Sequence, residues 1–373
     1  MIYFDNAATT LIKPECVLKA DEYALKSLCA NAGRGSHSAA IKAAQIVYEA
    51  RKAVKNFVFC DDVAFTFNCT DALNTVLFGT AKKNGHIVTT VYEHNSTLRP
   101  IHELGKRMNV KYTAVRPNAH GIIDPAEIER AIRPNTYLIA VNHVSNVTGA
   151  VAPVTQIGNI AKRHGIPYLI DGAQSVGYLD VNMREIGCNY LCFSPHKGLH
   201  GTQGLGCLCV RGAPILHPFR FGGTGTSSHT LDQPTDFPDG FESGTLPVNS
   251  IFALIAAITH HKRLSLTVKR NLAACGDMLR AELCKIQGVK IYGKYNVLPN
   301  LVCFNLQKTD AASVGNILND QYDIAVRSGL HCAPLCHAFL GTINSGAVRA
   351  SLSYHNSVNE VDFFIKAIRE ICR

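Results

Sequence analysis

The chain has 373 residues, of which 47% are hydrophobic and 17% charged, an ordinary globular composition with enough length for a large core and two domains. Its net charge of +9 comes from Lys and Arg residues spread along the chain without a basic run, so we expect no nucleic-acid partner. No apolar run approaches the roughly twenty residues of a membrane helix, and the N-terminus does not resemble a signal peptide, so we expect a cytoplasmic protein without a membrane partner.

The predicted elements of the first two thirds of the chain alternate between helices and strands, which indicates an α/β protein. A helix is expected after His37, because apolar residues recur from Ala40 to Phe57 at spacings of three and four. A second helix is expected from Leu73 toward Gly85, a candidate C-terminal stop. Short apolar runs predict buried strands at 86–91, 137–141, 168–170, 190–193 and 206–210, and helical segments near 125–132 and 154–164 separate some of them.

The pattern changes after Thr245. An apolar helix is expected at about 247–264 and an amphipathic one at about 265–286, followed by strand-like segments at 289–292, 300–306 and 323–327. The last helix opens with the capping box Ser357-Val-Asn-Glu360. We interpret residues 1–259 as an N-terminal segment with a large domain, and residues 260–373 as a smaller C-terminal α/β domain.

The fourteen cysteines are scattered along the chain, which is typical of buried free thiols in a reducing compartment. Several of them stand in apolar strand-like runs, namely Cys192, Cys207, Cys209 and Cys303. A zinc site is an alternative for Cys207-x-Cys209 and for Cys332, Cys336 and His337, but no second ligand pair stands at a familiar spacing. We therefore expect no metal.

Lys197 stands in Phe193-Ser-Pro-His-Lys-Gly198, directly after a predicted buried strand. Burial there, close to Ser194 and His196, would lower the pKa of the amine and suit it for a Schiff base. Asp171 ends another strand, so its carboxylate would face the crevice in which α/β proteins bind ligands. Pyridoxal phosphate (PLP) needs such an acid to keep its ring nitrogen protonated. The pair predicts a PLP site; Lys197 alone would be interpreted as a surface lysine, and the alternative for Asp171 is a helix cap.

Three further residues follow predicted strands or open a predicted helix. Thr70 is a natural cap for the helix at Leu73 and could hold the phosphate of the cofactor. His94 follows the strand at 86–91 and could stack on the cofactor ring. Asn146 follows the strand at 137–141 and could reach the phenolic oxygen of the ring.

The segment Arg327-Ser-Gly-Leu-His-Cys332-Ala-Pro follows a strand and contains Gly and Pro, which predicts a mobile loop. A thiol near Arg327 and His331 is a candidate nucleophile with a lowered pKa, and the alternative is one more buried cysteine. Arg349 lies in the apolar strand-like run 347–352 and needs an anionic partner there. A substrate carboxylate could serve through a bidentate pair.

Together these motifs resemble the class V aminotransferase family, most closely its cysteine desulfurase branch. The form Arg-x-Gly-x-His-Cys-Ala is similar to the group II (Suf-like) desulfurases and selenocysteine lyases. The resemblance runs essentially end to end, through Tyr3-Phe-Asp-Asn-Ala-Ala, Arg34-Gly-Ser-His37, Thr70-Asp71, Glu93-His94-Asn95, Ser145-Asn146-Val-Thr-Gly149, Asp171-Gly-Ala-Gln174, Ser194-Pro-His-Lys197, Phe241-Glu-Ser-Gly-Thr245, Arg327-Ser-Gly-Leu-His-Cys332-Ala and Arg349-Ala-Ser.

The resemblance implies a type I PLP-dependent transferase fold, similar to aspartate aminotransferase, with a large mixed sheet. It implies a homodimer with the active sites at the subunit interface. Lys197 would bond covalently to PLP, Asp171 would pair with the ring nitrogen, and His94 would stack on the ring and take part in catalysis. The other cofactor contacts would come from Thr70, Asp71, Gln174 (at the phenolic oxygen), Ser194, His196 and, from the other subunit, Thr245. The substrate would be bound by His37, Asn146 and Arg349.

The implied reaction converts L-cysteine to L-alanine and leaves a persulfide on Cys332, which passes to an acceptor protein or a small thiol. Iron–sulfur cluster assembly is one pathway that such sulfur enters. The sequence departs from the family at Leu330, and a second thiol, Cys336, follows Cys332 closely, so the route of the sulfur stays open. L-Selenocysteine also stays open as the substrate.

Other functions fit parts of the same pattern. A selenocysteine lyase would share every cofactor residue, and in another class V aminotransferase Cys332 would be incidental. A sulfur-carrier scaffold without enzymatic activity is an alternative from another class. The stretch Gly201-Thr-Gln-Gly-Leu-Gly206 hints at a Rossmann oxidoreductase, but it does not follow a strand-to-helix turn at the start of a βαβ unit.

Overall fold

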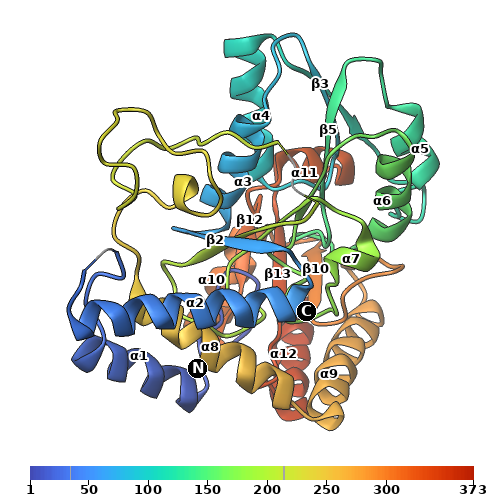
Figure 1. Cartoon of the computed structure of the whole chain (residues 1–373). Helices are drawn as coiled ribbons and strands as arrows, with labels where there is room; N and C mark the ends of the chain where they lie inside the picture. The colour runs from blue at the N-terminus through green and yellow to red at the C-terminus, as the bar shows by residue number, and fades with distance from the viewer. Residues whose placement is uncertain (34, 213–214) are drawn as a thin grey trace.

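The computed structural model describes residues 1–33, 35–212 and 215–373 of the chain. At its centre lies a seven-stranded sheet in the order β2-β8-β7-β6-β5-β3-β4, of which β2, β3 and β5 are labelled in Figure 1. All its strands run in one direction except β8, which is antiparallel to both of its neighbours. The strands are β2 (Asp62–Thr66), β3 (His86–Thr90), β4 (Lys111–Val115), β5 (Thr136–Asn142), β6 (Tyr168–Asp171), β7 (Tyr190–Phe193) and β8 (Gly206–Val210).

Both faces of this sheet are buried, because successive side chains of a strand enter different apolar cores. In β5, Leu138 and Ala140 join the core under α3 and α4, whereas Ile139 and Val141 join the core under α2, α6 and α8. This two-sided burial explains why the strands read as continuous apolar runs. The helices of this part are α1 (Glu15–Ser27), α2 (Ser38–Val58), α3 (Cys69–Gly79), α4 (Asn95–Met108), α5 (Pro125–Arg130), α6 (Val154–Arg163), α7 (Met183–Ile186) and α8 (Val248–Arg263), with a 3-10 turn at Asp239–Phe241.

The C-terminal part contains a second, antiparallel sheet in the order β12-β13-β10-β9. Its strands are β9 (Val289–Tyr292), β10 (Leu301–Leu306), β12 (Arg327–Gly329) and β13 (Ala347–Ser351). Its helices are α9 (Leu266–Cys284), α10 (Ala311–Tyr322), α11 (Pro334–Leu340) and α12 (Val358–Ile371). The N-terminal strand β1 (Ile2–Tyr3) pairs with β11 (Ile324–Ala325), and Phe4 packs on Phe364 in this second core.

Most of the elements expected from the sequence are present, within one to three residues at their ends. The Ser357 capping box is present, and nine of the fourteen cysteines are buried as free thiols. The expected stop of the second helix at Gly85 is wrong: α3 ends at Gly79, and Gly85 lies against the ring of Tyr137 before β3. The single strand expected at 323–327 is two strands, β11 and β12, which belong to different sheets.

Several elements were not expected from the sequence: β1, α1, β2, α4, β4, α7, α10 and α11. Helix α4 contains Pro100, a residue that normally ends or kinks a helix, so its sequence argues against a continuous helix there. Within the described ranges, no helix is long and apolar enough to cross a membrane. The boundary proposed at residue 259 falls inside α8, and it stays a prediction.

Candidate active site

A cavity of about 310 Å³ opens at the carboxyl edge of the large sheet. The parallel strands β2, β3, β5, β6 and β7 all end there, so the residues that follow them meet at one place. The cavity is lined by Ala8, Asn68, Cys69, Thr70, Leu73, His94, Ser96, Asn142, Val144, Asn146, Asp171, Ala173, Gln174, Ser194, His196 and Lys197. Most of the residues predicted to bind a cofactor are therefore in one cavity.

Lys197 and Asp171 form the ionisable pair of this cavity. The Lys197 side chain is half-buried, and burial lowers the pKa of its amine, although the nearby Asp171 carboxylate acts in the opposite direction. Burial raises the pKa of Asp171, whereas the Ala173 amide, which donates to Asp171 Oδ1 at 2.9 Å, lowers it. The protonated ring nitrogen of a bound cofactor would balance the negative charge of the Asp171 carboxylate.

The N-terminus of α3 lies at one end of the cavity. Asn68 caps the helix through the Asp71 amide, and the Cys69 amide donates to Ser194 Oγ at 2.7 Å. Gly206 permits this arrangement, because a Cβ there would lie 2.4 Å from the Asn68 backbone. The helix N-terminus and the nearby hydroxyl groups of Thr70 and Ser194 provide donors for a phosphate group.

His94 and His196 contribute uncharged imidazoles. His94 caps α4, and its Nδ1 accepts from the Ser96 amide at 3.0 Å. Burial lowers the pKa of His94 and of His196 to about 4. The second ring is held by a 2.9 Å contact between His196 Nδ1 and Thr9 Oγ1. A neutral His94 ring at the cavity wall is suited to stacking on a flat cofactor.

Arg349 lies beside the cavity and already has an anionic partner in the protein. Its Nη2 donates to Asp5 Oδ1 and its Nη1 to the Asn146 carbonyl, both at 2.9 Å. These bonds use two of its five N–H groups, and the buried Nε has no partner among the described residues. The guanidinium therefore keeps donors for a substrate carboxylate. The anionic partner that its apolar strand required is, within the protein, Asp5.

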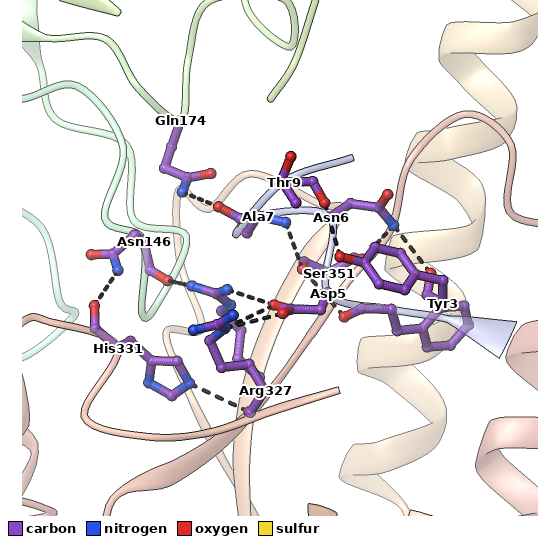
Figure 2. Close-up of polar contacts among 12 residues, drawn as sticks. Tyr3, Asp5, Asn6, Ala7, Thr9, Asn146, Gln174, Arg327, His331 and Ser351 are labelled. Carbon is purple, nitrogen blue, oxygen red and sulfur yellow. Dashed lines mark hydrogen bonds and ion pairs between the residues drawn. The ribbon is translucent and has the colours of Figure 1, made fainter. Parts of the chain in front are cut away.

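Two amide side chains link the cavity to other segments. Gln174 Nε2 donates to the Ala7 carbonyl at 2.8 Å, and Asn146 Nδ2 donates to the His331 carbonyl at 2.7 Å (Figure 2). Asn146 Oδ1 is buried and finds no partner within the described ranges. The N-terminal segment and the Cys332 segment are thus both attached to the cavity wall.

Cys332 is exposed and lies on a short turn between β12 and α11, outside the residues that line the cavity. Its carbonyl oxygen accepts from the Asn95 amide at 2.7 Å, which places the turn next to His94 at the rim. Arg327 is paired with Asp5, and both ring nitrogens of His331 have hydrogen-bond partners. His331 is therefore already hydrogen-bonded in this arrangement, and the charge of Arg327 is paired with Asp5 through Nε.

Three predicted site residues lie apart from the cavity. His37 caps α2 at the surface, and Thr245 lies in a separate hollow of about 510 Å³ with Arg51. The Asp71 carboxylate pairs with Arg220 at 3.0 Å instead of lining the cavity. Arg34, which belongs to the motif before His37, lies outside the described residues.

Three residues of the site had no role in the sequence interpretation. Asp5 holds Arg349 and Arg327; Ser96 lies 2.7 Å from Thr70 Oγ1; and Cys69 Sγ lies 3.6 Å from Asp171 Oδ1. An acid just after the strand-like Tyr3-Phe pair was the one signal available for Asp5. Nothing in the local sequence marks Ser96 or Cys69.

The fold and the cavity define a class of protein: an α/β enzyme with a lysine and a buried acid in one cavity at the carboxyl edge of a mostly parallel sheet, beside a helix N-terminus. The chain belongs to the class V aminotransferase family, whose model (Aminotransferase class-V) matches residues 2–364. This confirms the resemblance seen in the motifs.

The chain is similar over its full length to proteins named as probable cysteine desulfurases. It is 34% identical to a probable cysteine desulfurase of Methanothermobacter thermautotrophicus, an alignment that covers 99% of this chain and 94% of the relative. It is 33% identical to a probable cysteine desulfurase of Pyrococcus abyssi, over 100% and 94% of the two chains.

Solved structures confirm the predicted fold class, the type I fold of PLP-dependent transferases. The apo structure of a cysteine desulfurase from Thermococcus onnurineus NA1 superposes with a TM-score of 0.92 at 32% identity, covering 100% of this chain and 94% of the other. The cysteine desulfurase CsdA of Escherichia coli has the same fold, with a TM-score of 0.88 at 23% identity over 99% and 94% of the two chains.

Proposed function

We propose that this protein is a PLP-dependent cysteine desulfurase, which converts L-cysteine to L-alanine and takes the sulfur as a persulfide on Cys332. The observation that carries the proposal is the cavity in which the Lys197 amine and the buried Asp171 carboxylate lie together, with the exposed Cys332 turn attached to its rim. Membership of the class V aminotransferase family, and the cysteine desulfurases among its relatives, support both the activity and the cofactor.

The residues of the cavity fit PLP chemically. Lys197 provides an amine for the aldehyde, Asp171 an acid for the ring nitrogen, and His94 a neutral ring for stacking. The N-terminus of α3, with the hydroxyls of Thr70 and Ser194, provides donors for the phosphate. When bound, PLP supplies an electron sink that makes the Cα proton of an amino acid acidic.

The chain's own residues would orient the substrate and move its protons. Arg349 and Asn146 would bind the carboxylate of L-cysteine through their remaining N–H groups. The Lys197 amine, whose pKa burial lowers, would take the Cα proton at Nζ and return it within the same closed cavity. The uncharged His94 would cover the other side of the reacting group.

Cys332 would perform the sulfur transfer. Its thiolate attacks the sulfur of L-cysteine, an S–S bond forms, and the C–S bond breaks with its electron pair left on the carbon of the substrate. That carbon takes up a proton, so that the products are alanine and a Cys332 persulfide. A thiol or an acceptor protein then takes the terminal sulfur from the persulfide.

The wider setting is also part of this proposal. The enzyme would work in the cytoplasm as a homodimer and deliver sulfur to an acceptor protein or a small thiol, with iron–sulfur cluster assembly as one destination. The exposed position of Cys332 supports transfer to an external acceptor, because the persulfide can be reached from solvent.

Alanine and sulfide released from L-cysteine by the purified yellow protein would test the activity. We expect stoichiometric alanine and persulfide in the absence of a reductant, and turnover with sulfide release once dithiothreitol is added. Alanine formed without a keto acid excludes an aminotransferase. A turnover number many-fold higher with L-selenocysteine would favour the alternative, a selenocysteine lyase, and absence of alanine would contradict the proposal.

A further inference from the structure

A chain of hydrogen bonds lies directly behind the Cys332 turn. His331 Nδ1 is 3.1 Å from His337 Nε2, and His337 Nδ1 is 2.8 Å from Thr342 Oγ1. At the other end, His331 Nε2 is 3.4 Å from the Arg327 carbonyl oxygen. The two rings are buried and lie within 18° of parallel. This series of hydrogen bonds thus connects the start of β12 with the end of α11.

Each end of this series of hydrogen bonds meets a backbone carbonyl, which can only accept. His331 Nε2 lies 3.4 Å from the Arg327 carbonyl oxygen, and the Thr342 hydroxyl donates to the His337 carbonyl at 3.4 Å. Whichever tautomers the two rings adopt, a single hydrogen bond joins His331 Nδ1 to His337 Nε2. Burial lowers the pKa of His331 to about 2 and that of His337 to about 4, so both rings are neutral at physiological pH.

The backbone of the turn is held in a conformation that L-residues seldom adopt. His331 has a φ of 49° and Cys332 a φ of 55°, two consecutive left-handed residues that are not glycine. On the cavity side, Asn146 donates to the His331 carbonyl and the Asn95 amide to the Cys332 carbonyl, both at 2.7 Å. Figure 2 shows the Asn146 amide directed at the backbone of His331. The side facing away from the cavity is held by the His331 ring.

We propose that His337 is a positioning residue, which acts through His331 and with Thr342 to hold Cys332 in its left-handed backbone conformation at the rim of the active site. The proposal rests on the proposed desulfurase function, because it concerns the thiol that takes the sulfur. Without a hydrogen-bonding side chain at residue 337, His331 Nδ1 would be a buried polar atom with no partner, which costs more than the bond itself contributes. The His331 ring would then rotate, and the turn would lose its support from behind.

This arrangement also defines what His331 does not do. Its Nδ1 is bonded to His337, and burial lowers the pKa of the ring to about 2, so His331 is a poor base for the Cys332 thiol. The role of the pair is therefore geometric: it fixes where the sulfur of Cys332 stands, and it leaves cofactor binding and the Cα proton transfer to other residues.

Two substitutions of the same residue test the proposal in the holoenzyme. In His337→Gln the side-chain amide, which can donate or accept, can still hydrogen-bond to His331 Nδ1, whereas in His337→Leu no hydrogen-bonding group is left. Three quantities are measured: hydrogen exchange of the 330–333 peptide, the single-turnover rate of persulfide formation on Cys332, and the absorbance change of PLP on addition of L-cysteine. The first of these does not depend on activity.

We expect His337→Leu to raise exchange in the turn about tenfold or more and to slow persulfide formation about 10- to 100-fold, as the loss of a buried hydrogen-bond partner implies. The absorbance change and the KM for L-cysteine should stay at wild-type values. His337→Gln should restore both altered quantities to within about threefold of the wild type. Equal behaviour of the Gln and Leu variants, or wild-type exchange and rate in His337→Leu, would overturn the proposal.

His86→Leu is the matched control. His86 is likewise buried and neutral, and its two ring nitrogens lie 2.8 and 3.0 Å from the hydroxyls of Thr136 and Thr113, in the large sheet. We expect it to lower the melting temperature without altering the Cys332 turn; an equal slowing of persulfide formation would show general destabilisation and refute the role of His337. If the wild type itself forms no alanine, the proposed function fails, and the exchange of the turn still decides whether His337 holds it.

Discussion

At the scale of single residues, Cys332 and Cys336 are close in the sequence but have opposite surroundings. Cys332 is exposed on the turn before α11, whereas Cys336 is fully buried inside that helix. Burial raises the pKa of the Cys336 thiol far above its ordinary value, so almost none of it is thiolate at neutral pH. A direct sulfur relay through Cys336, which the sequence left open, is therefore disfavoured.

We predict that Cys332→Ser keeps the yellow cofactor but loses sulfide release, because a hydroxyl is a far poorer attacker of sulfur than a thiolate. Cys336→Ala should retain release within about threefold of the wild type, since the buried thiol takes no part in the chemistry. Mass spectrometry after L-cysteine treatment should find one reducible sulfur on Cys332 and none on Cys336. Wild-type desulfurisation by Cys332→Ser would disprove the assigned nucleophile.

Glu93, just after β3, is a second residue with an unusual environment. It is fully buried; its Oε1 accepts from the Thr90 hydroxyl at 2.8 Å and from the Asn142 amide at 3.0 Å. Its Oε2 has no partner within the described ranges. Burial raises the pKa of Glu93 from 4.5 to about 8, so the carboxyl is protonated at neutral pH. The motif Glu93-His94-Asn95 thus carries a neutral acid behind the cavity.

The raised pKa makes stability depend on pH. Because the folded protein binds the proton more tightly than the unfolded chain, the contribution of Glu93 is complete below pH 4.5 and is lost as the pH rises to about 8. Glu93→Gln should remove this loss, which amounts to at most about 1.4 kcal/mol per pH unit. Denaturant unfolding of both proteins from pH 5 to 9 measures the difference, and parallel curves would contradict the prediction.

At the scale of elements, the N-terminal segment fastens the two strands that carry the cationic residues. Arg327 of β12 and Arg349 of β13 stand opposite each other in the ladder, where two like charges would repel. Asp5, which follows β1, pairs with both of them, at 3.0 and 2.9 Å (Figure 2). A residue from the beginning of the chain thereby orients the guanidinium that we propose for the substrate carboxylate.

We predict that Asp5→Asn lowers the free energy of unfolding by about 3–5 kcal/mol, because it leaves the buried Arg349 without its countercharge. It should also raise the KM for L-cysteine more than it lowers kcat, since the guanidinium loses its orientation. Glu103→Gln is the control: it removes an exposed pair with Arg107 and should cost less than about 1 kcal/mol. Equal unfolding free energies for the two variants would contradict the buried role of Asp5.

At the scale of the whole molecule, one region has the character of a subunit interface. The segment from Ile215 to Thr245 carries large apolar side chains that face solvent, among them Ile215 and Phe221, which are 80% and 77% exposed. Thr245, expected at the cofactor, lies in a hollow apart from Lys197 of the same chain. Both observations support a dimer in which Thr245 completes the partner's site.

We predict that Lys197→Ala and Thr245→Ala are each nearly inactive, but that mixing the two after subunit exchange restores activity. Random exchange makes about half of the dimers mixed, and each mixed dimer has one intact site, so about a quarter of wild-type activity should return. Sedimentation at the assay concentration checks the dimer. A fully active monomer, or no restoration on mixing, would count against the model.

The sequence by itself determined the elements whose pattern is local. The helix at 38–58 and the strands of the large sheet have apolar periodicities or runs that no other structure would bury as well, and the Ser357 capping box specifies the start of α12. The order of strand ends and polar residues was likewise enough to predict Lys197 and Asp171 in one crevice. These features depend on neighbours in the chain.

Only the tertiary structure decided the contacts between distant segments. Asp5 meets Arg349 across 344 residues, and Asn146 meets His331 across 185, pairings for which the local sequence holds no signal. The burial of Cys336 beside the exposed Cys332, and the engagement of both His331 nitrogens, follow from how α11 packs against the rest of the chain. Hydrogen bonds and burial depend on positions in space, and residue order constrains these only through the completed fold.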